Sequence, residues 1–227
     1  MKILALDAST QALSVAVLDT VAGDAAREYF EIAPRAHAAK LLTTAQQLLD
    51  ESGWRLAELD GLAFGRGPGA FTGLRIAAGF IQGLAYGSEL PVAPVSTLAA
   101  LASRALDAYE GDHVRVVQDA RMGEIYTADY SRMATGPQAL NVERVIVPAD
   151  LEPIADATGW LYAGNGWDVV AASGGTRPPV CVQWPHALNI AYLGAAMLAR
   201  GEGVPAQQAL PVYVRDDVAR KPASPTN

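Results

Sequence analysis

The fold of the first half of the chain is decided by one glycine-rich stretch, Gly65-Arg66-Gly67-Pro68-Gly69-Ala70-Phe71-Thr72-Gly73. It follows a short apolar segment, residues 61–64, and precedes a long apolar run, residues 72–86. The short segment indicates a strand and the long run indicates a helix. Glycine permits positive φ and close backbone approach, and proline fixes one φ in advance. We therefore predict a tight strand-to-helix turn, built for packing rather than for catalysis.

The same stretch formally matches the dinucleotide-binding fingerprint G-x-G-x-x-G/A. That fingerprint requires a second strand that ends in an acidic residue about 20 residues further on. The next apolar segment, residues 91–95, is followed by Ser96 and has no acid at its end. The stretch also lacks the Gly-Lys-Ser/Thr ending of a P-loop. A phosphate cradle is therefore disfavoured against a packing turn.

The helix that follows contains Gly73, Gly79 and Gly83. Each glycine costs about 1 kcal/mol of helix propensity relative to alanine, so a compensating gain is expected. Gly79 and Gly83 are four residues apart and share one face, where the missing Cβ lets another backbone come close. Since the rest of the helix is nearly apolar, it is either wholly buried or half at an interface.

Working outward, hydrophobic periodicity predicts two α/β lobes, residues 1–108 and 109–227, with the boundary between Ala105 and Gly111. In the first lobe we expect strands at 3–7, 12–19, 28–32, 61–64 and 91–95, and helices at 38–49, 72–86 and 97–108. In the second we expect strands at 114–117, 123–130, 143–147 and 160–163, and helices at 148–157 and 188–200. The tail, residues 205–227, is expected to be extended, to pack back in part, and to end in a mobile stretch at 222–225.

Composition narrows the classes of function. The formal net charge is −7, lysine occurs only at positions 2, 40 and 221, and the arginines form no stripe. Nucleic-acid binders normally cluster basic residues, so any contact with nucleic acid is expected to be indirect. A lone cysteine, Cys181, points to a reducing compartment and to a buried hydrophobe. We see no targeting segment or membrane span, and we expect a cytoplasmic protein.

No single segment of the chain identifies a protein family, but five segments that occur in this order do so together. They are Leu4-Ala5-Leu6-Asp7-Ala8-Ser9-Thr10, Gly67-Pro68-Gly69-Ala70-Phe71-Thr72-Gly73-Leu74-Arg75-Ile76, Pro94-Val95-Ser96-Thr97-Leu98, Asp119-Ala120-Arg121-Met122-Gly123-Glu124-Ile125-Tyr126 and Pro211-Val212-Tyr213-Val214-Arg215. From Lys2 to about Ala219 the chain resembles the TsaB family of bacterial tRNA threonylcarbamoyladenosine biosynthesis proteins. The resemblance implies an actin-like or hexokinase-like ATPase fold with two ribonuclease-H-like lobes, the second reduced.

The resemblance also implies a role. The family pairs with TsaD, which transfers a threonylcarbamoyl group to N6 of the adenosine beside the anticodon, in tRNAs that read codons beginning with adenine. A small ATPase, TsaE, completes the complex. This chain is then expected to be a non-catalytic subunit that binds and activates a TsaD-like transferase, and to contact tRNA only indirectly.

The catalytic relative carries a His-x-x-x-His metal site on the helix after the strand that corresponds to residues 92–95. Here Thr97 and Leu101 take those positions, and leucine cannot ligate a metal. The three histidines, His37, His113 and His186, lie in separate segments. We therefore expect no catalytic residue and no metal site. This expectation disfavours a transferase or, as in the older interpretation, a protease, because both would need that metal.

Two loops resemble the phosphate loops of actin-like ATPases. The first, residues 7–10, brings Asp7, Ser9 and Thr10, and Asp119 begins the second. These four residues are weak candidates for binding a nucleotide with magnesium. The second loop lacks glycines, and Gly164-Asn165-Gly166 is either an adenine-pocket wall or a simple turn. We expect no intrinsic cofactor, although ATP or ADP could lie at the partner interface; a small-molecule kinase or ATPase remains the alternative function.

For the partner interface, the resemblance and the glycine-faced helix together favour two helices. The expected docking residues are Leu41, Leu42, Ala45, Leu74, Ile76, Gly79, Phe80 and Gly83. An apolar face that awaits a partner often pairs with itself, so a homodimer is expected when the chain is isolated.

Overall fold

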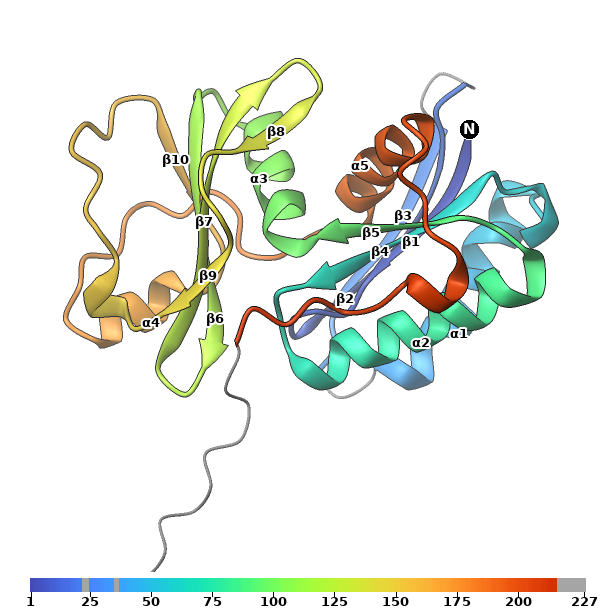
Figure 1. Ribbon diagram of the computed structural model, residues 1–227, viewed down its shortest axis with the longest axis horizontal. Helices are drawn as coiled ribbons and strands as arrows, with labels where there is room; N and C mark the ends of the chain where they lie inside the picture. The colour runs from blue at the N-terminus through green and yellow to red at the C-terminus, as the bar shows by residue number, and fades with distance from the viewer. Residues whose placement is uncertain (22–24, 35–36, 216–227) are drawn as a thin grey trace, which may run out of the picture.

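The computed structural model describes residues 1–21, 25–34 and 37–215, which form two sheets lying side by side (Figure 1). The first sheet has the strand order β3-β2-β1-β4-β5. Strands β1 and β2 are almost wholly buried on both faces, as their continuous apolar sequences require. The three antiparallel strands precede the two parallel ones: β1 (Lys2–Asp7), β2 (Ala12–Asp19), β3 (Ala25–Ile32), β4 (Gly61–Gly67) and β5 (Val92–Ser96).

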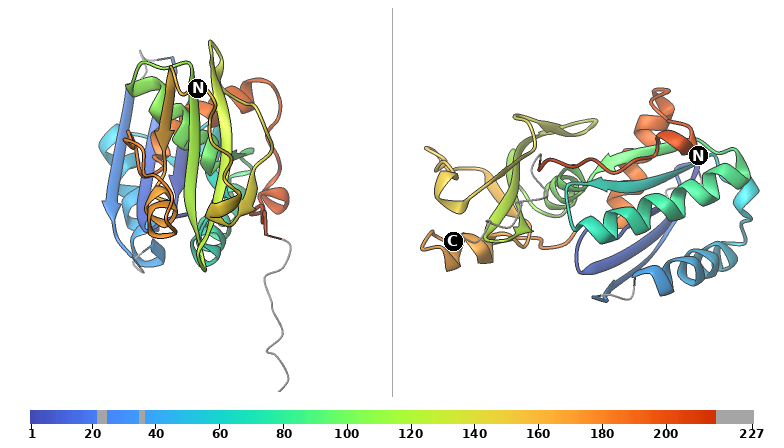
Figure 2. Two further views of the ribbon diagram at one scale, coloured as in Figure 1. Left: turned by 90° about the vertical axis from the view of Figure 1, so that its left-hand side faces the viewer. Right: turned by 60° about the horizontal axis from the view of Figure 1, so that its bottom comes forward.

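Helices cover both faces of this sheet (Figure 2). One face carries α1 (His37–Ser52) and α2 (Phe71–Ser88), and the opposite face carries α5 (Ala187–Ala199). Helix α1 ends before Gly53 and α5 ends before Gly201, both of which have positive φ. Glycine adopts this left-handed conformation without steric cost, which is why it commonly follows the last turn of a helix.

The second sheet has the order β10-β6-β7-β8, and β9 pairs with β7. Its elements are α3 (Thr97–Ala108), β6 (His113–Arg121), β7 (Glu124–Met133), β8 (Gly136–Ala139), β9 (Arg144–Ile146), β10 (Trp160–Ala163) and α4 (Trp167–Ala172). Short 3₁₀ turns complete the chain at Leu56–Glu58, Pro148–Asp150 and Ala206–Gln208. The expected fold class, two ribonuclease-H-like lobes with a reduced second lobe, is confirmed.

The lobes exchange helices across the boundary expected at residues 108 and 109. Helix α3 packs on β6 and β10 of the second sheet, whereas α5 returns to β1, β2, β4 and β5 of the first. Ser14 Oγ accepts the Ala187 N–H at 2.9 Å, and Glu28 accepts the Leu188 N–H at 3.1 Å. Two strands of the first sheet thus satisfy the first turn of α5, which no local sequence pattern could reveal.

Three local expectations were wrong. The helix expected at 148–157 is only the 3₁₀ turn at Pro148–Asp150, and strand β8 and helix α4 were not predicted. The four residues of β8 do not alternate, and α4 has six residues, so neither carries a periodic signal. The stretch at 222–225 lies outside the described residues.

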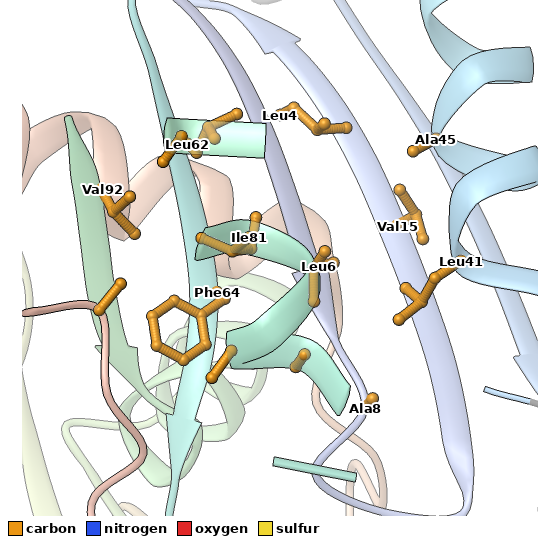
Figure 3. Close-up of a cluster of buried hydrophobic side chains, with 14 of the residues drawn as sticks. Leu4, Leu6, Ala8, Val15, Leu41, Ala45, Leu62, Phe64, Ile81 and Val92 are labelled. Carbon is orange, nitrogen blue, oxygen red and sulfur yellow. The ribbon is translucent and has the colours of Figure 1, made fainter. Parts of the chain in front are cut away.

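The core of the first lobe lies between the sheet and α1 and α2 (Figure 3). Phe64, Leu6 and Ile81 pack at its centre and are fully buried. No described helix is long and apolar enough to cross a bilayer.

Candidate functional site

The glycine-rich stretch packs directly against the turn that joins β1 and β2. A methyl group added at Gly73 would lie 1.8 Å from the Ala8 carbonyl oxygen, and one added at Gly69 would lie 2.5 Å from the Ser9 carbonyl oxygen. The Ala70 N–H donates to the Ser9 oxygen at 2.6 Å. The predicted close-packing turn is therefore confirmed, although the strand runs on to Gly67 and the helix begins only at Phe71.

Asp7 lies at the base of this turn and is almost completely buried. Its Oδ1 accepts the Ser9 N–H at 3.0 Å and the Ser9 hydroxyl at 2.8 Å. Its Oδ2 has no hydrogen-bond partner among the described residues. Burial raises the pKa of Asp7 to about 7, against the lowering effect of the two bonds from Ser9. Asp7 therefore holds the turn in place from below.

A cavity of about 190 Å³ lies between the two lobes. Ser9, Thr10 and Asp119 line it, so the structure brings together three of the four weak cofactor candidates, and Asp7 lies outside the lining. Asp119 is already engaged, because its carboxylate accepts from Arg121 Nη1 at 3.1 Å and from the Arg121 N–H at 2.7 Å. The two predicted loops therefore face one cleft.

The segment Gly164-Asn165-Gly166 is a closely packed turn that also contributes to the cavity. A methyl group at Gly164 would lie 2.1 Å from the Val117 carbonyl oxygen. Asn165 lines the cavity, and its Oδ1 accepts the Asp119 N–H at 3.1 Å. The turn expected from the sequence is therefore confirmed, while the role of this segment as the wall of an adenine pocket stays a prediction.

Several polar residues of the cavity wall were not among the candidates from the sequence, and three of them matter most here: Gln118, Tyr126 and Arg215. The first two lie on the strands that flank the Asp119 turn, and the third lies in the tail, 96 positions from Asp119 (215 − 119). Strand alternation could have placed Gln118 toward the cleft. The Pro211–Arg215 motif could have drawn attention to Arg215, but the sequence does not show which part of the fold this motif contacts.

Residues 209–215 cross from the first lobe to the second (Figure 1). The Val212 N–H donates to the Arg66 oxygen at 2.8 Å, and Arg75 Nε donates to the Tyr213 hydroxyl at 3.0 Å. At the far end, Arg215 donates to the Ala120 oxygen at 3.2 Å and pairs with Glu124. This segment, here called the strap, closes one side of the cavity.

Of the eight residues expected at a partner interface, three are buried within this chain. Leu41 and Ala45 pack in the core (Figure 3), and Leu74 is fully buried, so placing these three residues in a docking surface was wrong. They occupy the inner faces of their helices, which the apolar pattern alone could not distinguish from the outer faces. The others are exposed or half-buried: Leu42, Ile76, Gly79, Phe80 and Gly83.

The outer face of α2 is open. Methyl groups added at Gly79, Gly83 or Gly87 would meet no atom within 4 Å. The close approach expected at Gly79 and Gly83 therefore does not occur within this chain. Phe71 is 42% exposed at one end of this helix and Tyr86 is 75% exposed near the other. We call this surface the α2 face.

The two positions that correspond to the metal-binding histidines are both buried. Thr97 and Leu101 lie on α3 with no exposed surface. The histidines are dispersed: His37 contacts the Ala12 oxygen, and His186 pairs with Glu28 on another strand. Within residues 1–21, 25–34 and 37–215, no group of three or more His, Cys, Asp or Glu side chains could hold a metal ion.

Nearly the whole chain is similar in sequence to known proteins. The family model described as "TsaD: tRNA N6-adenosine threonylcarbamoyltransferase" matches residues 30–219. The tRNA threonylcarbamoyladenosine biosynthesis protein TsaB of Escherichia coli is 39% identical over 97% of each chain. The TsaB protein of Haemophilus influenzae is 33% identical over 97% of this chain and 96% of its own.

A solved structure gives the same result. YeaZ from Pseudomonas aeruginosa superposes with a TM-score of 0.85 at 43% identity, covering 93% of this chain and 99% of that one. Family model, relatives and structure agree over nearly the whole length. The chain therefore belongs to the TsaB family, and more broadly to the family that the TsaD model describes.

Proposed function

We propose that this chain is a non-catalytic subunit in the formation of N6-threonylcarbamoyladenosine in tRNA, and that it binds and activates a TsaD-like transferase. The names of its relatives support the pathway, and the match to the TsaD family model supports a paired, related partner. The modified base is the adenosine beside the anticodon, in tRNAs that read codons beginning with adenine.

The α2 face carries the docking part of this proposal. Gly79, Gly83 and Gly87 lower helix propensity by about 1 kcal/mol each, although a Cβ at any of them would meet no atom of the described chain outside its own helix backbone within 4 Å. Glycines exposed along one side of a helix let a partner backbone approach closely. Exposed aromatic rings at the two ends, Phe71 and Tyr86, are typical anchors of protein–protein interfaces.

The side chains at the expected metal positions support a non-catalytic role. Leu101 has no ligand atom, and Thr97 is fully buried in the same helix. A partner that retains its own metal site would then supply the chemistry, and this chain would supply the binding surface.

The remaining partners follow from the same role. We propose that a TsaE-like ATPase joins the complex, that ATP or ADP lies at the partner interface, and that tRNA is contacted indirectly. The α2 face also supports a homodimer when the chain is isolated. The lone Cys181 suits a protein of the reducing cytoplasm. The small number of lysines suits a protein that does not bind tRNA directly.

Two surface variants test the docking. Gly79→Leu places a bulky side chain on the α2 face, and Leu42→Glu places a charge on the exposed side of α1, where Leu42 is 61% exposed. Each is expected to lower retention by the purified TsaD-like partner, and tRNA modification with it, by at least about tenfold, as disruption of an interface centre does. The matched control is Leu140→Glu, on an exposed leucine of the second lobe. Full binding and modification by both folded variants would refute the interface.

The alternative, a small-molecule kinase or ATPase, rests on the meeting of Ser9, Thr10 and Asp119 in one cavity. Against it, the cavity of about 190 Å³ is smaller than the roughly 300–1,000 Å³ of sites that enclose drug-sized ligands. Calorimetry with magnesium-ATP on the isolated chain separates the two functions. Tight binding with turnover would establish the kinase and contradict a purely supporting role.

A further inference from the structure

Two polar residues that line the inter-lobe cavity each have an atom without a hydrogen-bond partner among the described residues, one an acceptor and the other a donor. Gln118 lines the cavity, is only 2% exposed, and its Oε1 has no partner among the described residues. Its Nε2 donates to the Pro68 oxygen at 3.4 Å, which fixes the orientation of the amide and leaves Oε1 as a free acceptor. A buried acceptor without a partner costs about 1–3 kcal/mol, so a donor is expected to fill the place beside it.

Arg215, in contrast, has a donor that needs an acceptor. Its Nε is buried and unpartnered within the described chain, while its Nη atoms contact Ala120, Met122 and Glu124. The first turn of α2 adds to this, since Phe71 lines the cavity and no side chain caps the amides of that turn. The Glu124 carboxylate already balances the charge of the Arg215 guanidinium, so the Arg215 Nε–H and the uncapped amides at the α2 N-terminus act here as hydrogen-bond donors, which suit an acceptor such as a carboxylate oxygen. The one carboxylate in the lining, that of Asp119, is already paired with Arg121.

Size sets the scale of the molecule. A cavity of about 150 Å³ holds benzene, and this one measures about 190 Å³. The walls between the polar atoms include Ala70, Leu74 and Val212, which suit a short carbon skeleton. We propose that this cavity binds a small organic carboxylate that also carries a hydroxyl or amine donor. The carboxylate faces Arg215 and the α2 amides, and the donor faces Gln118 Oε1. The unpartnered groups of the cavity, and not the proposed docking of a transferase, support this site, although Phe71 belongs to both the cavity lining and the α2 face.

The test uses two probes that differ by one hydroxyl group. The ¹⁵N-labelled full chain is titrated with L-lactate and, separately, with propionate, and amide chemical shifts are followed by NMR. L-lactate is expected to shift the amides of Gln118, Phe71 and Arg215 and to bind about 2- to 12-fold more tightly than propionate, the effect of one hydrogen bond.

Variants assign the preference to the cavity. Gln118→Leu is expected to remove the preference for lactate while keeping propionate binding, and Gln118→Glu is expected to weaken both probes because it adds a negative charge. Gln47→Leu, on the exposed side of α1, is the matched control and is expected to change nothing. The comparison of probes on the unaltered chain stands even if a Gln118 variant does not fold.

Three outcomes would overturn the proposal. The first is the absence of shifts from L-lactate up to about 50 mM, far above the range of a specific site, which would leave the cavity to water. The second is equal affinity for the two probes. The third is magnesium-ATP shifting the same amides at lower concentration than L-lactate, which would assign the cavity to a nucleotide.

Discussion

Single residues in this chain have their properties set by the segments that pack on them. Asp7 illustrates this, because its carboxylate is enclosed by the glycine stretch: a methyl group at Gly65 would lie 2.0 Å from Asp7 Oδ2. The close packing that keeps solvent out is also what raises the pKa of Asp7 to about 7. Asp7, a weak candidate for binding a nucleotide with magnesium, is therefore a buried acid whose pKa is raised by its surroundings.

Replacing Asp7 by asparagine is expected to change how stability depends on pH. Because the pKa of Asp7 rises from 3.8 to about 7 on folding, the folded state binds the proton more tightly. The unaltered chain therefore loses stability as pH rises from about 4 to 7, by up to about 4 kcal/mol, and Asp7→Asn does not. Urea denaturation at pH 4 and pH 8 measures this as a variant-minus-parent difference that increases with pH.

Thr97→Val serves as the control for Asp7→Asn. Thr97 Oγ1 is equally buried and has no partner among the described residues, but it does not titrate in this range. Its replacement is expected to shift stability by the same amount at both pH values. A difference between Asp7→Asn and the parent chain that stayed constant with pH would contradict the assignment.

Among the elements, helix α2 uses its glycines in two different ways. Gly73, in its first turn, lets the helix lie against the Ala8 carbonyl, whereas Gly79 and Gly83 face open space. From the sequence we expected all three glycines to serve close packing, because the sequence of an apolar helix does not show which side of the helix will be buried. The direction of each follows only once the helix is seated on β4 and β1.

Alanine substitutions separate these two uses. Gly73→Ala is expected to destabilise the isolated chain by about 3 kcal/mol, because its methyl group meets a backbone oxygen that cannot move freely. Gly79→Ala is expected to stabilise the isolated chain by about 0.5–1 kcal/mol, since the methyl group fits and helix propensity improves. Chemical denaturation of both variants measures the contrast. Equal losses in the two would show that Gly79 is packed within the chain.

For the whole molecule, the exchange of α3 and α5 is what joins the lobes. Helix α5 is bound back to the first sheet through Glu28, which pairs with His186 at 2.8 Å and accepts the Leu188 N–H. Burial opposes ionisation of Glu28, but the contacts from His186, Ser14 and Leu188 together hold its pKa below the ordinary value. Polar contacts between residues 158 to 160 positions apart thus add to the apolar packing of α5 on the first sheet.

Glu28→Gln is expected to loosen this attachment. The loss should be about 1–3 kcal/mol at neutral pH, the range for hydrogen bonds to a charged group. Because the pKa of Glu28 is lowered on folding, its contribution is present above the unfolded pKa and disappears as pH falls through the folded pKa. Hydrogen exchange of the α5 amides, together with denaturation at pH 7 and pH 3, measures both effects.

Glu31→Gln on the same strand is the matched control. Glu31 pairs with Lys40 at 2.6 Å, but both side chains are more than a third exposed. Exposed ion pairs contribute about 0–1 kcal/mol, so α5 should exchange as in the parent chain. If Glu28→Gln behaved like Glu31→Gln, the attachment of α5 would not depend on Glu28.

The sequence by itself determined the elements with strong periodicity, including β2, α3 and β10 to the residue, and the tight turn at the glycine stretch. Local propensity and glycine spacing decide these features within a few residues, so they can be predicted from the sequence alone. Only the tertiary structure decided which lobe α3 and α5 join, which leucines of α1 and α2 are buried, and that Gln118 and Arg215 complete the cavity. Those outcomes depend on contacts between distant segments, where burial and hydrogen bonding act across the fold and leave no local pattern in the chain.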